Sequence, residues 1–141
     1  KLRYLTLKFD DNEPLIYGLR TVDYNKKVYV TEGPIDSLFL PNSIAVAGSD
    51  FSKLKSIVPI EQAVIVFDNE RRNPQLHKLM EQVIEEGYTI CFWPKTVKQK
   101  DINDMVLNGL SSNVIEDIIN KNKFSGLSAK MTLSDWSKIS G

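Results

Sequence analysis

The sequence predicts an α/β fold in which about four parallel strands are flanked by helices. Short apolar runs alternate with helical patterns between Val28 and about residue 120, which is the pattern of a βαβ series. The apolar runs have no polar face, as is typical of parallel strands that helices cover on both sides. The chain has 141 residues, and a chain of this length can bury a core without disulfides or metal ions.

Two short segments near the amino terminus precede the main series. Residues 1–8 alternate polar and apolar side chains as a strand does, and a turn cluster at 10–14 precedes a short apolar segment at 15–18. From residue 28 onward the apolar runs are compact and rich in β-branched residues, so each is interpreted as a buried strand. These runs cover residues 28–30, 44–47, 63–67 and 88–93.

Helices are expected between and after these strands. The strongest helical pattern begins at Asn73-Pro74, places its apolar residues on one face and ends at Gly87. Pro34 suits the first position of a short helix. The tail after residue 120 looks less regular, although Trp136 is expected to pack back on the body of the protein. The predicted helices cover residues 34–40, 50–57, 73–86, 101–107 and 113–120.

Composition and charge exclude several classes of protein. Lys+Arg and Asp+Glu each number 18, so the formal net charge is zero and any nucleic-acid site must be a local patch. A single cysteine and a single histidine cannot build a disulfide framework or a zinc ribbon. We find no run of 18 apolar residues and no secretory leader, so no membrane partner is expected. The glycine-rich phosphate-binding motifs and the serine-hydrolase motif are also missing.

Acidic residues follow two of the predicted strands, at the edge where open α/β sheets bind their ligands. Glu32 follows one strand, and Asp68, Asn69 and Glu70 follow another. If the chain stays extended after the second strand, Asp68 and Glu70 point to one side and Asn69 to the other. Converging carboxylates favour Mg²⁺, because this hard cation takes oxygen ligands and bridges to substrate phosphates. Such a site suits phosphoryl transfer.

The same residues also fit a purely structural explanation. Asp, Asn and Gly are ordinary turn residues after a strand. Asp101 can be a helix cap, and Asp36 can be a solvated helix residue. The clustering of acids at two strand ends favours a site, and both explanations stay open at this point. Basic residues near the acids could hold phosphates or be plain surface, and they are Arg71, Arg72, Lys95, Lys98 and Lys100.

Three motifs, in order along the chain, resemble those of the topoisomerase–primase (Toprim) domain. Residues 28–38 end a strand with Glu-Gly and carry an Asp four residues after the Glu. Residues 65–70 are similar to the Asp-x-Asp motif, and residues 100–105 to the Lys-Asp-x-x-[DE] motif of primases. The segments 34–40 and 47–50 look closest to the primases of tailed bacteriophages.

The resemblance implies a Toprim domain at residues 27–124. Residues 1–26 then end an amino-terminal catalytic subdomain and supply a short strand segment from that neighbour, and residues 125–141 form a tail that packs on the body. The zinc ribbon, most of the amino-terminal subdomain and the helicase-binding region of family members are missing from the sequence. Since the chain also starts at Lys1 instead of Met, it is expected to be an incomplete fragment.

The resemblance also implies roles for the acidic residues. Glu32 resembles the Toprim glutamate, which is a metal ligand or general base. Asp68 and Glu70 resemble the acidic pair that holds Mg²⁺ or Mn²⁺, although Glu70 stands where Asp is commoner. Asp36 and Asp101 resemble the secondary, metal-binding acids of the primase site.

The activity that the resemblance implies is that of a DNA primase, a nucleotidyltransferase that makes RNA primers on single-stranded DNA during replication. Its expected partners are the DNA template, ribonucleoside triphosphates and, through regions outside this chain, the replicative helicase, in the cytoplasm of the host cell. Lys100-Asp101 and Tyr17-Gly18-Leu19 favour a primase over a Toprim-type metal-dependent nuclease, which would use the same acids for hydrolysis. A non-catalytic interaction module in a replication complex is a third alternative.

Overall fold

Within the described residues, seven strands form one mixed sheet whose four central strands are parallel. This computed structural model describes residues 6–7, 15–17, 22–47, 51 and 54–138. In these ranges no helix combines the length and the apolar character that crossing a membrane needs. The strands are β1 (Thr6–Leu7), β2 (Leu15–Tyr17), β3 (Val28–Thr31), β4 (Ser43–Ala47), β5 (Ala63–Val66), β6 (Thr89–Cys91) and β7 (Lys123–Phe124).

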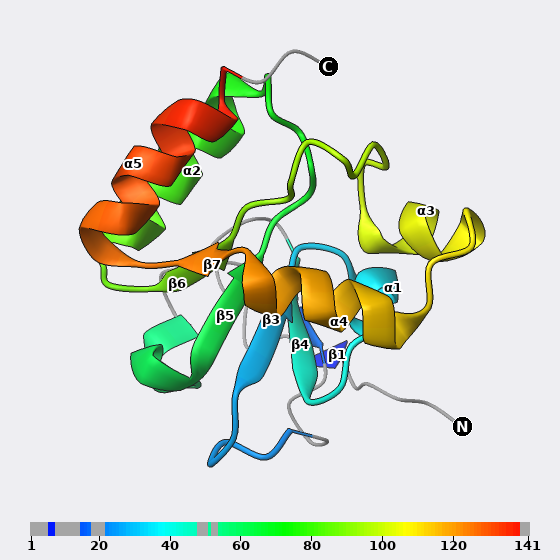
Figure 1. The fold of residues 1–141 in the computed structure, drawn as a ribbon. Helices are drawn as coiled ribbons and strands as arrows, with labels where there is room; N and C mark the ends of the chain where they lie inside the picture. The colour runs from blue at the N-terminus through cyan, green and yellow to red at the C-terminus, as the bar shows by residue number, and fades with distance from the viewer. Residues whose placement is uncertain (1–5, 8–14, 18–21, 48–50, 52–53, 139–141) are drawn as a thin grey trace.

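The order of the strands across the sheet is β1-β2-β4-β3-β5-β6-β7. Figure 1 shows the central strands β4, β3 and β5 side by side. The parallel strands are β4, β3, β5 and β6, which confirms the predicted α/β class and its four parallel strands. Antiparallel strands flank them on both sides, since β2 pairs with β4 and β7 pairs with β6. The two amino-terminal strands therefore extend this same sheet, and their assignment to a neighbouring subdomain stays a prediction.

The helices begin where the sequence supplies a capping side chain. Asn73 accepts hydrogen bonds from the backbone N–H groups of Gln75 and Leu76, as the Asn-Pro signal predicts. Asp101 and Ser111 cap the next two helices in the same way. The helices are α1 (Pro34–Ser37), α2 (Pro74–Glu85), α3 (Ile102–Leu107), α4 (Ser112–Lys121) and α5 (Gly126–Trp136), and 3₁₀ turns lie at Leu54–Ser56 and Ile60–Gln62.

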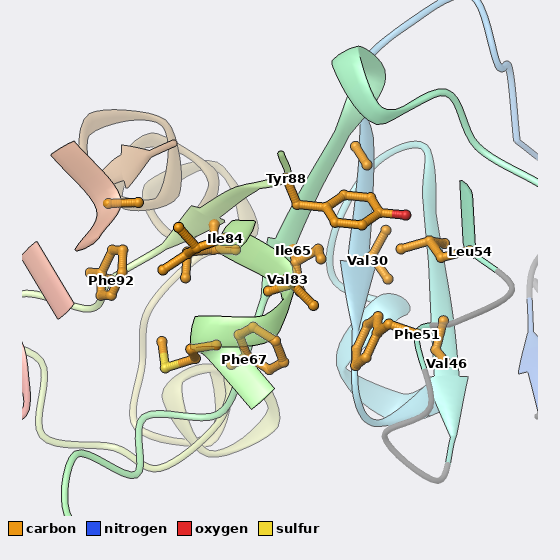
Figure 2. Packing of buried hydrophobic residues seen from close by; sticks show 14 of the residues in the cluster. Val30, Val46, Phe51, Leu54, Ile65, Phe67, Val83, Ile84, Tyr88 and Phe92 are labelled. Atoms are coloured by element: carbon orange, nitrogen blue, oxygen red, sulfur yellow. The ribbon is translucent and has the colours of Figure 1, made fainter. Parts of the chain in front are cut away.

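Alternate side chains of the central strands fill two apolar cores, one on each face of the sheet. In β3, Val28 and Val30 face the first core and Tyr29 faces the second. The first core lies against α2 and α5, and Figure 2 shows Val30 and Phe67 among its packed side chains. The second core lies against α3 and α4 and buries Cys91, the single cysteine of the chain. Each fully buried large apolar side chain contributes about 1.5–3 kcal/mol.

Two helices are shorter than the sequence predicts. α1 ends at Ser37 instead of residue 40, because the next N–H groups bond to carbonyls three residues back and Pro41 follows. The helix expected at 50–57 is reduced, in the described residues, to the 3₁₀ turn at Leu54–Ser56. Asp50, where that helix was expected to begin, lies outside the described residues.

The carboxy-terminal tail is more regular than the sequence predicts, so that expectation is wrong. The tail forms β7 and then α5, which packs beside α2 (Figure 1). The buried residues of α5 are Ala129, Leu133 and Trp136, while Leu127 and Met131 on the same helix are exposed. Because apolar residues occupy both sides of α5, they do not mark one face in the sequence. Trp136 itself is buried, as expected.

Candidate functional site

The first two acidic residues are brought together by neighbouring parallel strands. β3 and β5 are adjacent, with Thr31 opposite Val66. Glu32 directly follows β3 and Asp68 is the second residue after β5, so both leave the sheet at the same carboxyl edge. The backbone N–H of Asp68 donates a hydrogen bond to the Glu32 carboxylate. The structure therefore places Glu32 and the start of the loop that carries Asp68 in direct contact.

The Glu32 side chain is half-buried and only partly satisfied. Its Oε1 atom is buried and has no hydrogen-bond partner among the described residues. Burial raises the pKa of Glu32, and the charges of Glu70 and Asp36 raise it further, while the Asp68 N–H and Lys100 act in the opposite direction. A buried acceptor without a partner costs about 1–3 kcal/mol. This oxygen is therefore suited to receive a ligand.

Asp68 lies among four other carboxylates. The pKa of Asp68 is raised to about 7, first by burial and then by the negative charges of Glu32, Asp36, Asp101 and Glu70. Among the described residues, the ion pairs that form do not join any of these acids to a cation. These five residues are termed the acidic cluster, and it holds an excess of negative charge in a partly buried place.

Two members of the acidic cluster also organise the start of α3. Asp36 is only 8% exposed, and its Oδ1 atom accepts a hydrogen bond from the backbone N–H of Asn103 at 2.9 Å, so it is not a solvated helix residue. Asp101 caps α3 through a 2.8 Å hydrogen bond from the N–H of Asp104, as its structural explanation predicts. A Cβ atom at Gly33 would lie 3.0 Å from the Oδ2 atom of Asp36, so the glycine leaves room for this carboxylate.

The chain turns directly after Asp68, so the condition under which Asp68 and Glu70 would point to one side, an extended segment, is not met. The backbone N–H of Glu70 donates to the carbonyl of Asp68 at 2.9 Å, which folds the acidic loop 68–70 back on itself. The side chains of Asp68 and Glu70 are therefore not held on one side of a continuing strand. Local patterns cannot show this turn, because the bonds that fix the loop come from elsewhere in the chain.

Asn69 supplies most of those bonds, although the sequence pattern marks it only as a turn residue. Its backbone N–H donates to the carbonyl of Lys100 at 2.6 Å. Its Nδ2 atom donates to the carbonyls of Val97 and Gln99 at 3.0 and 3.1 Å. Its Oδ1 atom is buried without a partner among the described residues. Asn69 thus ties the acidic loop to the segment that precedes Asp101.

Two cavities open beside the start of α2, and Glu70 lines both of them. The smaller, of about 230 Å³, has Glu32 as a second acidic wall. The larger, of about 530 Å³, combines Glu70 with basic side chains. The smaller cavity is lined by Glu32, Glu70, Asn73, Gln75, Leu76 and Leu79, and the larger by Asn69, Glu70, Arg71, Arg72, Asn73, Pro74 and Lys98.

The predicted phosphate-binding residues fall into two groups. Arg72, Lys95, Lys98 and Lys100 have exposed side chains. Arg72 and Lys98 also line the larger cavity, which brings positive charge beside the acidic cluster. Arg71 is half-buried, and its guanidinium group donates to two backbone carbonyls at 3.2 and 2.7 Å. Arg71 is therefore already engaged within the protein.

The chemistry of the acidic cluster fits a hard divalent cation such as Mg²⁺ or Mn²⁺. Its members offer only oxygen ligands, which these ions prefer, and the Oε1 atom of Glu32 lacks a partner in the described structure. In the described ranges, no three His, Cys, Asp or Glu side chains are grouped closely enough to hold a metal ion. The structure therefore does not group the carboxylates of Glu32, Asp68 and Glu70 closely enough to share one ion as they stand.

Comparison with known proteins adds one relative. No protein-family model matches the chain. Over 140 residues, the chain is 39% identical to the DNA primase of Enterobacteria phage T4. The match covers 97% of this chain and 40% of that primase, so the chain spans less than half the length of this relative. The resemblance to phage-type primases is thereby confirmed, while the Toprim domain stays a prediction.

Proposed function

We propose that this chain is the catalytic Toprim core of a phage-type DNA primase and takes part in making RNA primers on single-stranded DNA. Its similarity to the primase of phage T4 supports a primase-related function. The observation that supports a catalytic role is the acidic cluster at the carboxyl edge, with its partnerless Glu32 oxygen and the raised pKa of Asp68. Phosphoryl transfer depends on positioning and on cations that neutralise charge. A cluster of carboxylates can hold such cations and fix their position.

The metal would be Mg²⁺ or Mn²⁺, held by Glu32, Asp68 and Glu70 with Asp36 and Asp101 as neighbouring acids. When bound, the ion supplies positive charge to the transferring phosphoryl group and to the attacking hydroxyl. The protein groups orient this arrangement, because the Asp68 N–H holds one end of the Glu32 carboxylate and leaves the Oε1 atom unpartnered.

The larger cavity is the proposed place for the triphosphate of a ribonucleotide. Arg72 and Lys98 are exposed cations on its lining, next to Glu70. The exposed Lys95 and Lys100 would add positive charge for the backbone of the DNA template. Since the net charge of the chain is zero, binding should depend on these local cations and weaken as salt rises. Contact with the replicative helicase is assigned to regions outside this chain.

The substitution Asp68→Asn tests the proposal in the intact protein that carries this chain. Primer synthesis from a template, four ribonucleotides and Mg²⁺ should fall by more than about 100-fold, because the amide keeps the shape of the carboxylate and loses its charge. Circular dichroism should show an unchanged fold. Asp135→Asn, at an exposed acid of α5, is the matched control and should keep its activity.

Two outcomes contradict the proposal. Primer synthesis at the wild-type rate by Asp68→Asn would leave Asp68 as a turn residue. Cleavage of end-labelled template in place of synthesis would assign the same acids to a nuclease.

A further inference from the structure

Both ends of the acidic loop 68–70 are attached to Trp93, the second residue after β6. Before the loop, the carbonyl of Phe67 accepts a 2.9 Å hydrogen bond from the Nε1 atom of Trp93. After the loop, the Nη2 atom of Arg71 donates to the carbonyls of Trp93 and Pro94 at 3.2 and 2.7 Å. The loop is therefore closed by one residue of the neighbouring strand end.

Trp136 of helix α5 contacts both residues that close the loop, Trp93 and Arg71. The Nε1 atom of Trp136 donates to the carbonyl of Trp93 at 3.1 Å, so that carbonyl accepts from both Trp136 and Arg71. The Arg71 guanidinium lies 6.0 Å from the centre of the Trp136 ring, within the range of a cation–π contact. His77 of α2 completes the group, because its Nε2 atom donates to the carbonyl of Arg71 at 2.5 Å and its ring packs 6.1 Å from Trp136.

The four residues Arg71, His77, Trp93 and Trp136 are termed the Arg71 clasp. The Nη2 atom donates to two backbone carbonyls, while Nε is buried without a partner among the described residues. The adjacent Arg72 is exposed instead, although both arginines line the larger cavity. The two neighbouring arginines therefore have different surroundings, and those of Arg71 are suited to holding the backbone.

We propose that Arg71 is a positioning residue that, together with Trp136, fixes the acidic loop for the reaction, which makes α5 a working part of the site. This inference rests on the proposed function, since primer synthesis is the reaction that the loop geometry serves. A displacement of about 1 Å in a reacting group can lower the rate about 100-fold. Loss of the clasp therefore lowers kcat, while the KM for ribonucleotides changes little.

Hydrogen exchange tests the clasp without reference to activity. In the intact protein, the amides of residues 67–73 should exchange at least about tenfold faster in Trp136→Ala and in Arg71→Gln than in the wild type, because loop opening becomes easier. Lys130→Gln is the matched control on α5, since it removes only the exposed 2.8 Å ion pair with Glu85. Unchanged exchange in both clasp variants overturns the proposal.

Kinetics separate positioning from phosphate binding at Arg71. Arg71→Lys keeps the charge but lacks the planar group that reaches two carbonyls and lies over a ring. For a positioning residue, Arg71→Lys and Arg71→Gln both lower kcat about 10–100-fold and leave the KM for ribonucleotides within about twofold. A raised KM in Arg71→Gln that Arg71→Lys restores would assign Arg71 to phosphate binding and overturn the proposal.

Trp136→Phe gives an intermediate test, because it keeps a ring and removes the N–H that bonds to Trp93. Its exchange rate and kcat should lie between those of the wild type and Trp136→Ala. Values equal to those of the wild type would show that the hydrogen bond from Trp136 to the Trp93 carbonyl does not help to fix the loop. If the intact wild-type protein makes no primer, the proposed function fails, while hydrogen exchange still decides whether the clasp holds the loop.

Discussion

Strand β3 and the residue that follows it contribute to two partly buried clusters of polar side chains. The two clusters differ in charge and in hydrogen bonding. The first centres on Tyr29, whose hydroxyl donates to the Oε2 atom of Glu116 at 2.9 Å and accepts from the Nδ2 atom of Asn120 at 2.8 Å. The Oδ1 atom of Asn120 accepts in turn from Lys27 at 2.5 Å and Lys123 at 3.2 Å. These five residues, termed the tyrosine network, contain charges of both signs, and the Tyr29 hydroxyl has both a donor and an acceptor.

The acidic cluster begins three residues further along the same chain segment and has the opposite character. Its charges are all negative, Glu32 Oε1 has no partner in the described structure, and the pKa of Asp68 is raised to about 7. In the tyrosine network the Tyr29 hydroxyl has both of its partners within the protein, and satisfied buried polar groups of this kind stabilise a fold. The burial and the like charges of the acidic cluster raise the pKa of Asp68, so its ionised form costs stability, and under the proposed function a cation would offset this cost. The two groups therefore differ in the sign of their charges and in the hydrogen-bond partners of their central groups more than in burial.

The largest effect on this comparison is expected from Glu32→Gln. Primer synthesis should fall by more than about 100-fold. Without metal, the free energy of unfolding should stay equal or rise by about 1 kcal/mol, because one of several like charges is removed. Primer assays and urea unfolding in EDTA measure the two quantities.

Added Mg²⁺ should raise the Tm of the wild type and leave that of Glu32→Gln nearly unchanged, since a ligand stabilises only the state that binds it. Marked destabilisation of Glu32→Gln without metal would instead assign Glu32 to the structure.

Tyr29→Phe should give the reverse result. The ring still fills the second core, but Glu116 and Asn120 lose a hydrogen-bond partner. We expect the free energy of unfolding to fall by about 1–3 kcal/mol and primer synthesis to stay unchanged. Tyr88→Phe is the matched control, because the buried Tyr88 hydroxyl has no partner in the described structure and its removal should not destabilise the protein. Equal losses in the two variants would contradict the network.

The smallest expected effect is a change in the free energy of unfolding at alkaline pH. The pKa of Tyr29 is raised from 10.0 to about 12, mainly by burial. The stability gained by keeping this hydroxyl neutral is therefore present below pH 10 and is lost as the pH rises toward 12. The deficit of Tyr29→Phe relative to the wild type should shrink by about 1 kcal/mol between pH 9 and 11, measured by urea unfolding. A constant deficit would show that Tyr29 ionises as freely in the folded chain as in the unfolded one.

Much of the fold could be predicted because its signals are local. Apolar runs marked the parallel strands, and Asn73 marked the start of α2 through bonds to residues two and three positions away. The same-edge placement of Glu32 and Asp68 followed from the geometry of parallel strands alone. α5 was missed because exposed Leu127 and Met131 obscure its buried side.

The rest of the site depends on contacts between distant segments. The turn at Asp68 is fixed by Asn69, whose partners lie about thirty residues away in segment 97–100. Arg71 looks like a phosphate ligand in the sequence, and only its contacts with Trp93 and Trp136 give it another role. A one-dimensional pattern contains the residue types of a site, but not the backbone carbonyls that will face them.

Cys91 is buried in the second core, where thiol reagents do not reach it in the folded protein. Burial raises the pKa of the Cys91 thiol, and the thiolate is the form that reacts with alkylating reagents. Because the chain has a single cysteine, any thiol labelling of residues 1–141 must come from molecules in which β6 has separated from the helices over it. The rate at which Cys91 itself is labelled therefore measures how often that core opens.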